Sequence, residues 1–518
     1  MRVVTAEQMR AADAAAVARV GDVALMRAAG DAIAETIVAL APGARRIVAF
    51  AGRGNNGGDA FAALAAHATM CAGDTTCERI VYADASASAS PGRRDAEARA
   101  SAAGVVTRPF PPTLDGARAA LGGSDIALDA MLGVGARAEP TGAFALAIDA
   151  LATHPCVLAI DLPTGVDATT GAIGTHTVRA HATLALGAPK LGLLLEPARA
   201  YVGALYLGDI GLHDEIERVA ASAETPDRFA MLDDAEFFTL LPKRDDESDK
   251  RRSGAPLIVA GSPQFSGAAV LCARGAARAG AGYVTVAASD ATAPALRAHL
   301  VEEIVVTYDA SDVPGAIEAL LDLTNSSNAV AIGPGLGLSD RTGEIVRGFL
   351  TKLERPFVAD ASALFHLAKH LDILRGKACV LTPHAGEFAR LSGEGTIAPG
   401  ERVTRLRAFV ARTGITTLLK GSATLIDDGT TMHVNATGTN ALATAGTGDV
   451  LSGMIATLLA QGLAPVDAAR AAAYWHGLAG REAARQRRIG VVAGDVHEAL
   501  GRALPSPPPP RTRVQRIA

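Results

Sequence analysis

Short apolar runs that end in glycine-rich or acidic loops recur along the chain and restrict its fold more than any other feature. The first clear example is the run 46–51 (RIVAFA), followed by the loop 52–59 (GRGNNGGD) and a helical pattern over 61–70. From residue 256, similar runs alternate with helical patterns as far as 416–419. Strands that alternate with helices are typical of parallel sheets with helices on both faces. The sequence therefore predicts an α/β protein made of doubly wound units.

Length and composition agree with two such domains. The chain has 518 residues, of which 49% are hydrophobic and only 4% aromatic, as expected for α/β packing of small residues. The net charge of −5 gives no indication of binding to nucleic acid or to an anionic membrane. Five scattered cysteines without a C-x-x-C pair are expected to be reduced thiols. Because no uncharged apolar run approaches the roughly eighteen residues of a membrane span, we expect a soluble, cytoplasmic protein.

Composition also suggests where the domains end. Between 243 and 252 only Ser248 is uncharged, which indicates a solvated loop, although such a loop can also close over a nucleotide. The tail begins with PSPPPP and is basic, so it is predicted to be disordered. The expected divisions are a first domain at 1–222, a linker with the charged loop at 223–253, a second domain at 254–504 and the tail at 505–518.

The loop 52–59 is a strong site signal in the first half. Its four glycines and two adjacent asparagines supply backbone N–H and amide groups that can hold phosphates and orient a polar ring. Two later apolar runs lead to Asp129 and Asp161. Each aspartate alone is more simply a turn or helix-cap residue, but the pattern repeats at three strand ends. Ligands of doubly wound sheets bind outside the carboxyl ends of the strands. One crevice is therefore expected to contain Asn55, Asn56, Asp59, Asp129, Asp161 and Thr164.

A comparable signal in the second half is the stretch 445–449 (AGTGD). Apolar residues at helical spacing follow it, so its glycines lie where a helix begins. The first N–H groups of a helix bind anions, and glycines let a phosphate approach them. Asp449 would repel such a phosphate but is well placed to accept a proton from a hydroxyl that attacks it. The alternative is that the glycines make a turn and Asp449 only caps the helix.

Other polar loops follow the apolar runs of the second half and would share this site. They are 333–337 (GPGLG), 360–364 (DASAL), 382–387 (TPHAGE) and 420–424 (KGSAT). Taken alone, His384 would be a helix-cap or surface histidine.

These motifs resemble those of two families of nucleotide-repair enzymes. The second half resembles the ADP-dependent NAD(P)H-hydrate dehydratases of the ribokinase-like carbohydrate-kinase family, through GPGLG, DASAL, LTPHAGEFARL, LKGSATLI and NATGTNALATAGTGDVLSG. The first half is similar to NAD(P)H-hydrate epimerases, through AGRGNNGGD, LDAMLGVGA and AIDLPTGVD. Their order matches the bifunctional bacterial enzymes. The resemblance implies a Rossmann-like epimerase domain followed by a ribokinase-like dehydratase domain.

The resemblance also implies an activity. The first domain would interconvert the R and S hydrates of NADH and NADPH, called NADHX and NADPHX, with Asp161 as acid/base at C6. The second would dehydrate the S form with ADP and Mg²⁺, giving AMP and phosphate. Asp449 would act as base while the amides from Gly446 to Gly448 steady the phosphoryl group. A homo-oligomer is expected.

Binding residues follow from the same resemblance. In the first domain the hydrate would contact Asn55, Asn56, Gly57, Gly58, Asp59, Gly133, Val134, Gly135, Ala136, Arg137, Ala138, Glu139 and Asp161. A K⁺ ion would be held by Asn56, Asp129 and Thr164. In the second domain the hydrate would contact Ala268, Gly335, His384 and Asp449. The nucleotide would contact Lys420, Gly421, Ser422, Ala423, Thr424 and Gly448.

Departures from the family pattern and two alternative functions accompany this interpretation. Thr164 replaces the commoner serine and keeps its hydroxyl. Ser362 stands where an aspartate is usual, which puts in doubt a role of that loop in metal or water handling, and Ala60 replaces a glycine. The second domain could instead be a true small-molecule kinase, because phosphoryl transfer needs the same glycine-rich helix start. The first could be a binding module without catalysis.

Overall fold

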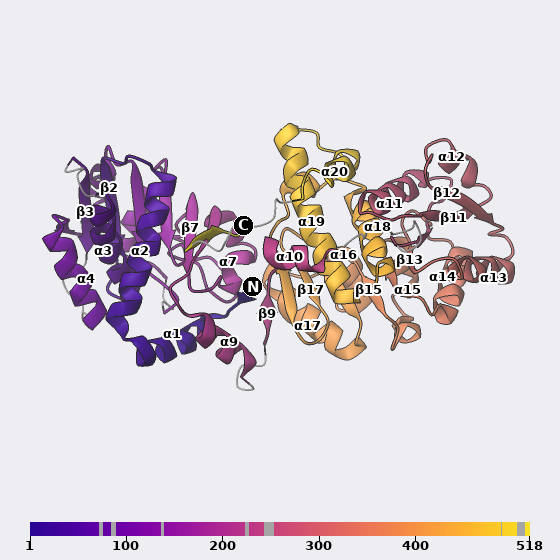
Figure 1. The fold of residues 1–518 in the computed structure, drawn as a ribbon, viewed down its shortest axis with the longest axis horizontal. Coiled ribbons are helices and arrows are strands. Elements are labelled where there is room, and N and C mark those ends of the chain that lie inside the picture. The colour runs from indigo at the N-terminus through magenta and orange to yellow at the C-terminus, as the bar shows by residue number, and fades with distance from the viewer. Residues whose placement is uncertain are drawn as a thin grey trace. The chain divides into compact units, whose positions relative to one another are not determined.

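The computed structural model shows two compact units (Figure 1). It describes residues 1–71, 76–83, 90–135, 139–222, 227–242, 253–487, 489–504 and 513–518. The first unit consists of Arg2–Phe229 and Pro509–Ala518, and the second of Met1 and Ala230–Pro508. Each has a largely parallel sheet with helices packed on it, which confirms the predicted fold class. Within the described residues no helix is both long and apolar enough to cross a membrane.

The first unit has the sheet order β19-β8-β7-β6-β5-β2-β3-β4, and only β19 runs antiparallel to its neighbour. Its strands are β2 (Arg46–Ala51), β3 (Glu78–Ala83), β4 (Val106–Pro109), β5 (Ile126–Ala130), β6 (Val157–Ile160), β7 (Ala182–Leu186), β8 (Ala204–Gly208) and β19 (Val514–Arg516). Its helices are α1 (Ala6–Val20), α2 (Asp22–Leu40), α3 (Asn55–Met70), α4 (Pro91–Ala102), α5 (Leu114–Leu121), α6 (Ala143–Leu151), α7 (Leu191–Leu194), α8 (Arg199–Val202) and α9 (His213–Ala221).

The central strands of this sheet are buried on both faces, as parallel strands usually are. One face packs against α2 and α3 (Figure 1) through residues such as Ile33 and Leu64. The other packs against α6 through Ile148 and Leu151. The strand order reverses between β2 and β5, which pair with each other while their chain neighbours lie on opposite sides. A doubly wound sheet binds its ligands at such a point.

The prediction of a disordered tail is wrong for the last residues of the chain. Strand β19 pairs with β8, with Gln515 opposite Leu207, and the Arg513 guanidinium lies 3.1 Å from Asp31 and 3.2 Å from Glu35 on α2. The pairing uses backbone groups of an otherwise open sheet edge, which the basic composition of the tail does not reveal. The proline run at 505–512 lies outside the described residues.

The second unit has the strand order β18-β17-β16-β15-β14-β13-β10-β11-β12, parallel from β12 to β16 and antiparallel at β17 and β18. Its strands are β10 (Pro256–Val259), β11 (Thr285–Ser289), β12 (Ile304–Tyr308), β13 (Ala329–Ile332), β14 (Phe357–Ala359), β15 (Cys379–Leu381), β16 (Thr416–Leu419), β17 (Thr424–Asp427) and β18 (Met432–Asn435). Its helices are α10 (Asp234–Leu240), α11 (Ser266–Arg278), α12 (Ala293–Arg297), α13 (Val313–Thr324), α14 (Asp340–Lys352), α15 (Ser362–Leu367), α16 (Ala385–Ser392), α17 (Arg402–Thr413), α18 (Thr447–Ala460), α19 (Pro465–Gln486) and α20 (Ala493–Ala499). The remaining short elements are β1 (Arg2–Val3), β9 (Phe229–Ala230), η1 (Leu371–Leu374), η2 (Pro399–Glu401) and η3 (Asn440–Leu442).

The second unit begins earlier than the expected boundary at 254. Helix α10 falls inside the expected linker, yet its Phe237 is fully buried with its ring centroid 5.1 Å from that of Tyr474 on α19. The Tyr474 hydroxyl donates to Asp234 at 2.5 Å. A helix of seven residues has too few turns to show a clear hydrophobic period, so the sequence did not reveal it. The charged loop at 243–252 lies outside the described residues.

Close packing of α18 on α11 fixes the start of the predicted anion site. A Cβ atom at Gly453 would lie 2.0 Å from the Cys272 carbonyl oxygen, so only glycine allows this approach. Met454 and Leu458 on the same helix are fully buried. The helix that carries Asp449 is therefore held rigidly against its neighbour.

Candidate active sites

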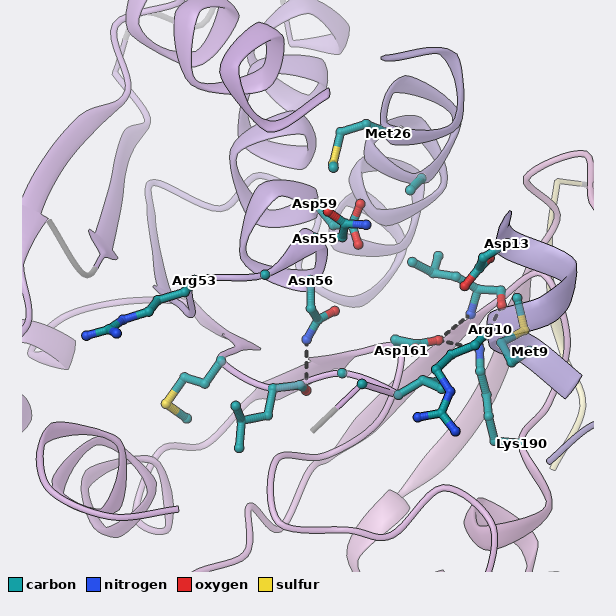
Figure 2. Close-up of a pocket in the computed structure, with 18 of the residues that line it drawn as sticks. Met9, Arg10, Asp13, Met26, Arg53, Asn55, Asn56, Asp59, Asp161 and Lys190 are labelled. Atoms are coloured by element: carbon teal, nitrogen blue, oxygen red, sulfur yellow. Dashed lines mark hydrogen bonds and ion pairs between the residues drawn. The ribbon is translucent and has the colours of Figure 1, made fainter. Parts of the chain in front are cut away.

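A cavity of about 910 Å³ lies in the first unit, at the carboxyl ends of β2, β5, β6 and β7 (Figure 2). It includes the switch point between β2 and β5. Predicted residues that line it are Asn55, Asn56, Asp59, Gly133, Val134, Gly135, Glu139 and Asp161. The predicted residues Ala136, Arg137 and Ala138 lie outside the described residues. The cavity thus brings together most of the predicted hydrate-binding residues.

The glycine-rich loop is shorter than predicted, because α3 already begins at Asn55 rather than near residue 61. Gly57 and Gly58 are buried in the first turns of the helix, although glycine disfavours helical structure. Tertiary packing explains this, since a Cβ at Gly57 would lie 2.0 Å from the Gly52 carbonyl oxygen. The N-terminus of a sixteen-residue helix consequently opens beside the cavity, with its unpaired N–H groups available to an anion.

Buried oxygen atoms gather beneath this helix. Asp129 is fully buried and accepts hydrogen bonds from the Thr164 hydroxyl and the Thr164 N–H, both at 2.7 Å. Burial raises the pKa of Asp129 to about 6, against the effect of the hydrogen bonds from Thr164. Leu132 joins Thr164 to Asn56, because its N–H donates to the Thr164 hydroxyl at 3.1 Å and its carbonyl accepts from Asn56 Nδ2 at 3.0 Å. The buried Oδ1 atom of Asn56 has no hydrogen-bond partner.

These oxygens are the donor type that a hard cation prefers. In the described part of the chain no group of three His, Cys, Asp or Glu side chains is arranged to bind a metal ion. Asn56, Asp129 and Thr164 are the residues whose amide, carboxylate and hydroxyl oxygens could hold a cation here. The partnerless Asn56 oxygen fits that expectation.

Asp161 lies at the other end of the cavity, directly after β6. Its backbone has φ of 68°, a conformation that non-glycine residues rarely adopt. Its Oδ1 atom bonds the Nζ of Lys190 and accepts from the Leu186 N–H at 3.3 Å (Figure 2). The Lys190 side chain is only 1% exposed and also donates to the Leu186 carbonyl at 2.8 Å. Asp161 is therefore a carboxylate held in place by a buried ammonium group.

Sequence reasoning missed two residues of this site. Lys190 follows β7 and Asp13 lies on α1, and neither segment contains one of the predicted site motifs. Both line the cavity with Asp161. Burial raises the pKa of Asp13 to about 6, while Lys190 opposes that rise. An isolated lysine after a strand and an aspartate in an alanine-rich helix give no local signal of chemistry.

In the second unit, Asp449 lies in the first turn of α18 and faces a group of charged side chains. Lys420 Nζ is 2.8 Å from Asp360 Oδ1 and 3.9 Å from Glu387 Oε2. The second Asp360 oxygen accepts from the Ser452 hydroxyl at 2.7 Å. Burial and then the charge of Asp360 raise the pKa of Asp449 to about 7, and Lys420 opposes them. Asp449 is thus a carboxylate that exchanges its proton near neutral pH.

The start of α18 has two features of an anion site. Gly446 precedes the helix with φ of 91°, and no side chain caps the free N–H groups. A Cβ at Gly448 would lie 3.3 Å from Lys420 Nζ, so the ammonium group stands next to these amides. Helix N–H groups and an ammonium group beside a base provide the parts needed to transfer a phosphoryl group to a hydroxyl.

The other predicted residues of the second unit lie at strand ends around this helix. Gly335 and Ala268 are neighbours, because a Cβ at Gly335 would lie 2.9 Å from that of Ala268. Gly421 and Ser422 are exposed in the turn before β17, which begins at Thr424. Ala423 is buried.

His384 and Ser362 have structural partners. His384 Nδ1 accepts from the Gly386 N–H at 3.0 Å, so this residue caps α16, as its simpler interpretation predicted. Its side chain is 60% exposed. Ser362 accepts from the Gly337 N–H at 3.1 Å and thereby holds the GPGLG loop. An aspartate is not required for that contact.

Comparisons with known proteins match both halves of the chain. A family model described as NAD(P)H-hydrate dehydratase matches residues 256–502, and one described as YjeF-related protein N-terminus matches residues 22–192. Bifunctional NAD(P)H-hydrate repair enzymes from Pyrobaculum aerophilum and Moorella thermoacetica are each 34% identical to the chain, over 93% and 96% of both sequences. A crystal structure of the ADP/ATP-dependent NAD(P)H-hydrate dehydratase from Bacillus subtilis, co-crystallised with ATP and Mg²⁺, is 32% identical and covers 53% of this chain and 96% of its own, with a TM-score of 0.46. The chain belongs to the family of bifunctional NAD(P)H-hydrate repair enzymes.

Proposed function

We propose that this protein repairs hydrated nicotinamide nucleotides. The first unit interconverts the R and S forms of NADHX and NADPHX, and the second dehydrates the S form with ADP, giving AMP and phosphate. The observation that carries the proposal is Asp449, a carboxylate with a pKa of about 7 beside the free N–H groups of α18 and the Lys420 ammonium. A base near neutrality next to an anion site suits activation of a hydroxyl toward a phosphate.

The dehydration follows from these groups in two steps. Asp449 accepts the proton of the C6 hydroxyl while the hydroxyl oxygen attacks the β-phosphorus of ADP, and AMP departs. The nitrogen lone pair then expels phosphate from C6, and loss of a proton from C5 restores the ring double bond. Lys420 and the amides at the start of α18 stabilise the negative charge of the phosphoryl group during its transfer.

Nucleotide and metal binding belong to the same proposal. Residues 420–424 and Gly448 hold ADP, with the exposed turn at Gly421 and Ser422 accessible to it. Mg²⁺ supplies charge neutralisation for the phosphates, and the Glu387 carboxylate near Lys420 is an oxygen donor of the kind this ion prefers. Ala268, Gly335 and His384 line the approach of the hydrate to Asp449.

In the first unit, the cavity at the switch point holds the hydrate. The N-terminus of α3 binds its phosphates, and Asp161 acts as acid/base at C6. K⁺ is held by Asn56, Asp129 and Thr164, which is supported by the buried, partnerless oxygen of Asn56. Because the substrates are damaged forms of soluble cofactors, we infer a cytoplasmic protein, and we expect it to assemble as a homo-oligomer.

The direct test is incubation of the purified chain with (S)-NADHX and either ADP or ATP. Recovery of NADH absorbance together with AMP formation from ADP is the expected result. Accumulation of a stable phosphorylated product without NADH would instead identify a small-molecule kinase. A second reaction that starts from the R hydrate, with ADP present, should also yield NADH, because the first unit converts it to the S form.

A further inference from the structure

We propose that Asp13 is a second catalytic residue of the first unit and acts as the acid that complements Asp161, while Lys190 is a positioning residue that keeps the roles of these two carboxyl groups different. The inference rests on the epimerase activity proposed above. It assigns a role to α1 and to the segment after β7, neither of which carries a glycine-rich or acidic site motif.

Lys190 is bound to Asp161 within a buried site. Its Nζ bonds Asp161 Oδ1 and the Leu186 carbonyl, and its side chain is almost fully buried. The Leu186 N–H also uses Oδ1 of Asp161, so Oδ2 has no protein partner in the described part of the chain. Asp161 lines the cavity, and its unoccupied oxygen is available to a substrate hydroxyl. Lys190 thus holds Asp161 through one carboxyl oxygen and leaves the other to face the substrate.

Asp13 differs from Asp161 in its contacts. It lies on α1 beside Asp161 and Lys190, lines the same cavity and makes no hydrogen bond within the described residues (Figure 2). The pKa of Asp13 is raised to about 6, first by burial and then by the charge of Asp161. Asp13 can therefore carry a proton up to about pH 6, while Asp161 is bonded to the Lys190 side chain.

A third carboxyl group in the cavity explains why Asp13 and Asp161 must differ in protonation. Asp59 on α3 is buried at the cavity and has no hydrogen-bond partner among the described residues. Its pKa is raised well above the usual value by burial and by Asp161 and Asp13. Lys190 can neutralise one of these three carboxylates at most. Three neighbouring carboxyl groups cannot all be charged in a buried site. Protons therefore remain on the carboxyl groups that do not contact the lysine.

This arrangement accounts for inversion at C6 without redox chemistry. Asp161 takes the proton of the C6 hydroxyl, the C6–N1 bond breaks as C6=O forms, and the bonding electron pair moves to N1. Asp13 gives its proton to N1, which is conjugated with the ring amide. After rotation about the C5–C6 bond, N1 attacks the other face of the carbonyl. Asp13 then recovers its proton from N1, and Asp161 returns its proton to the oxygen, so the protein ends in its initial state.

The test uses the full chain with (R)-NADHX and no ADP, so that only epimerisation proceeds, and follows the R and S forms by chromatography. Asp13→Asn should lower kcat by roughly 100-fold or more with KM changed only a few-fold, as expected for loss of an acid–base group. Glu7→Gln removes a similar charge from an exposed position of the same helix and should match the wild type. Dehydration of (S)-NADHX with ADP checks that the second unit of each variant is intact.

The pH profile separates a catalytic from a structural role. Wild-type kcat should fall above pH about 6 as Asp13 loses its proton, and the residual activity of Asp13→Asn should lack this decline. Lys190 lowers the pKa of Asp13, so Lys190→Met should move the decline to higher pH as well as reduce kcat, and Lys190→Arg should restore part of both. The charged groups around Asp13 that contribute to this profile are Arg10, Asp22, Asp59, Asp161 and Lys190.

Wild-type kcat and an unchanged alkaline decline in Asp13→Asn would overturn the inference. An unchanged decline in Lys190→Met would overturn the role given to Lys190. Failure of the wild type to convert the R hydrate at all would refute the proposed epimerase activity itself, which is a different result from a wild type that works and an Asp13→Asn variant that works equally well.

Discussion

The two sites contain the same pair of groups, a lysine bonded to an aspartate at the carboxyl ends of parallel strands, but they use the pair differently. In the first unit Lys190 bonds Asp161, the proposed acid/base itself. In the second unit Lys420 bonds Asp360, and Asp449 stands apart with its pKa raised to about 7. The lysine thus stabilises the charge of the reactive carboxylate in one site and leaves it unpaired in the other.

The difference corresponds to the reactions proposed for the two units. Phosphoryl transfer to a hydroxyl needs one base, and a base is most effective when its pKa lies near the working pH. Inversion at C6 needs proton transfer at two atoms, so the carboxylate that accepts a proton must be accompanied by a separate proton donor. The same ion pair therefore serves as part of the reactive group in the first unit and as a neighbouring charge in the second.

The largest expected effect comes from removing the unpaired base. Asp449→Asn should lower kcat for dehydration of (S)-NADHX by about 10²- to 10⁴-fold, the usual contribution of a general base. The wild-type rate should rise as pH increases through about 7, because Asp449 must be ionised to accept a proton. The asparagine variant should lack this rise.

Glu354→Gln, which changes an exposed carboxylate of the same unit, is the matched control and should behave as the wild type. Epimerisation of the R hydrate, measured without ADP, should be unaffected by either change. Full dehydratase activity in Asp449→Asn would show that the comparison assigns the wrong residue to the second site.

The next largest effect tests whether Lys420 acts on Asp449 from a distance. Lys420 lowers the pKa of Asp449, so Lys420→Met should raise it and move the acid limb of the dehydration profile to higher pH. At pH 7 we expect a loss of roughly 10- to 100-fold, the size of one electrostatic contact to the transferring phosphoryl group. Part of this loss should return at higher pH, and Lys420→Arg should retain an acid limb close to that of the wild type. A loss that is equal at every pH would limit Lys420 to nucleotide binding.

The third prediction concerns a K⁺ ion bound by side-chain oxygen atoms in the first unit. If K⁺ occupies the site of Asn56, Asp129 and Thr164, replacing choline by K⁺ at about ten times its dissociation constant should stabilise the first unit by roughly 1.4 kcal/mol. Asn56→Leu keeps the side-chain size but removes the partnerless oxygen, and its melting temperature should not respond to K⁺. A response equal to that of the wild type would place the cation elsewhere.

The fold was largely predictable because each strand is a short apolar run that ends in a polar loop. The pattern located β2, β5 and β6 and the loops that follow them, including Asp129 and Asp161. It failed where local preference and tertiary packing disagree. Asn55 to Gly58 form the start of α3 against the glycine preference for loops, because Gly57 must pack on the Gly52 carbonyl.

Site residues were predictable only where they lie close together in the sequence. The Asp449 motif places a carboxylate and free amides on one helix turn, so its spacing indicated an anion site, whereas the function followed from the family resemblance. Asp13 and Lys190 are separated by most of the first unit and meet only because α1 and the segment after β7 both border the cavity. No periodicity relates them. The pairing of β19 with β8 was missed for the same reason, since it joins segments about three hundred residues apart.

The smallest expected effect is on the stability of the first unit, whose edge strand β19 comes from the C-terminal end of the chain. Arg513 bonds Asp31 and Glu35 but is 43% exposed, so Arg513→Ala should cost only about 0.2–1 kcal/mol, as exposed ion pairs do. Arg516→Ala removes the same charge from an exposed position of β19 and should cost less.

The single tryptophan, Trp475, lies in the second unit, so its fluorescence follows unfolding of that unit while loss of epimerase activity follows the first. Arg513→Ala should shift the denaturant midpoint of the activity and leave the fluorescence midpoint unchanged. Equal shifts in both signals would mean that the units unfold together and that β19 stabilises the whole chain.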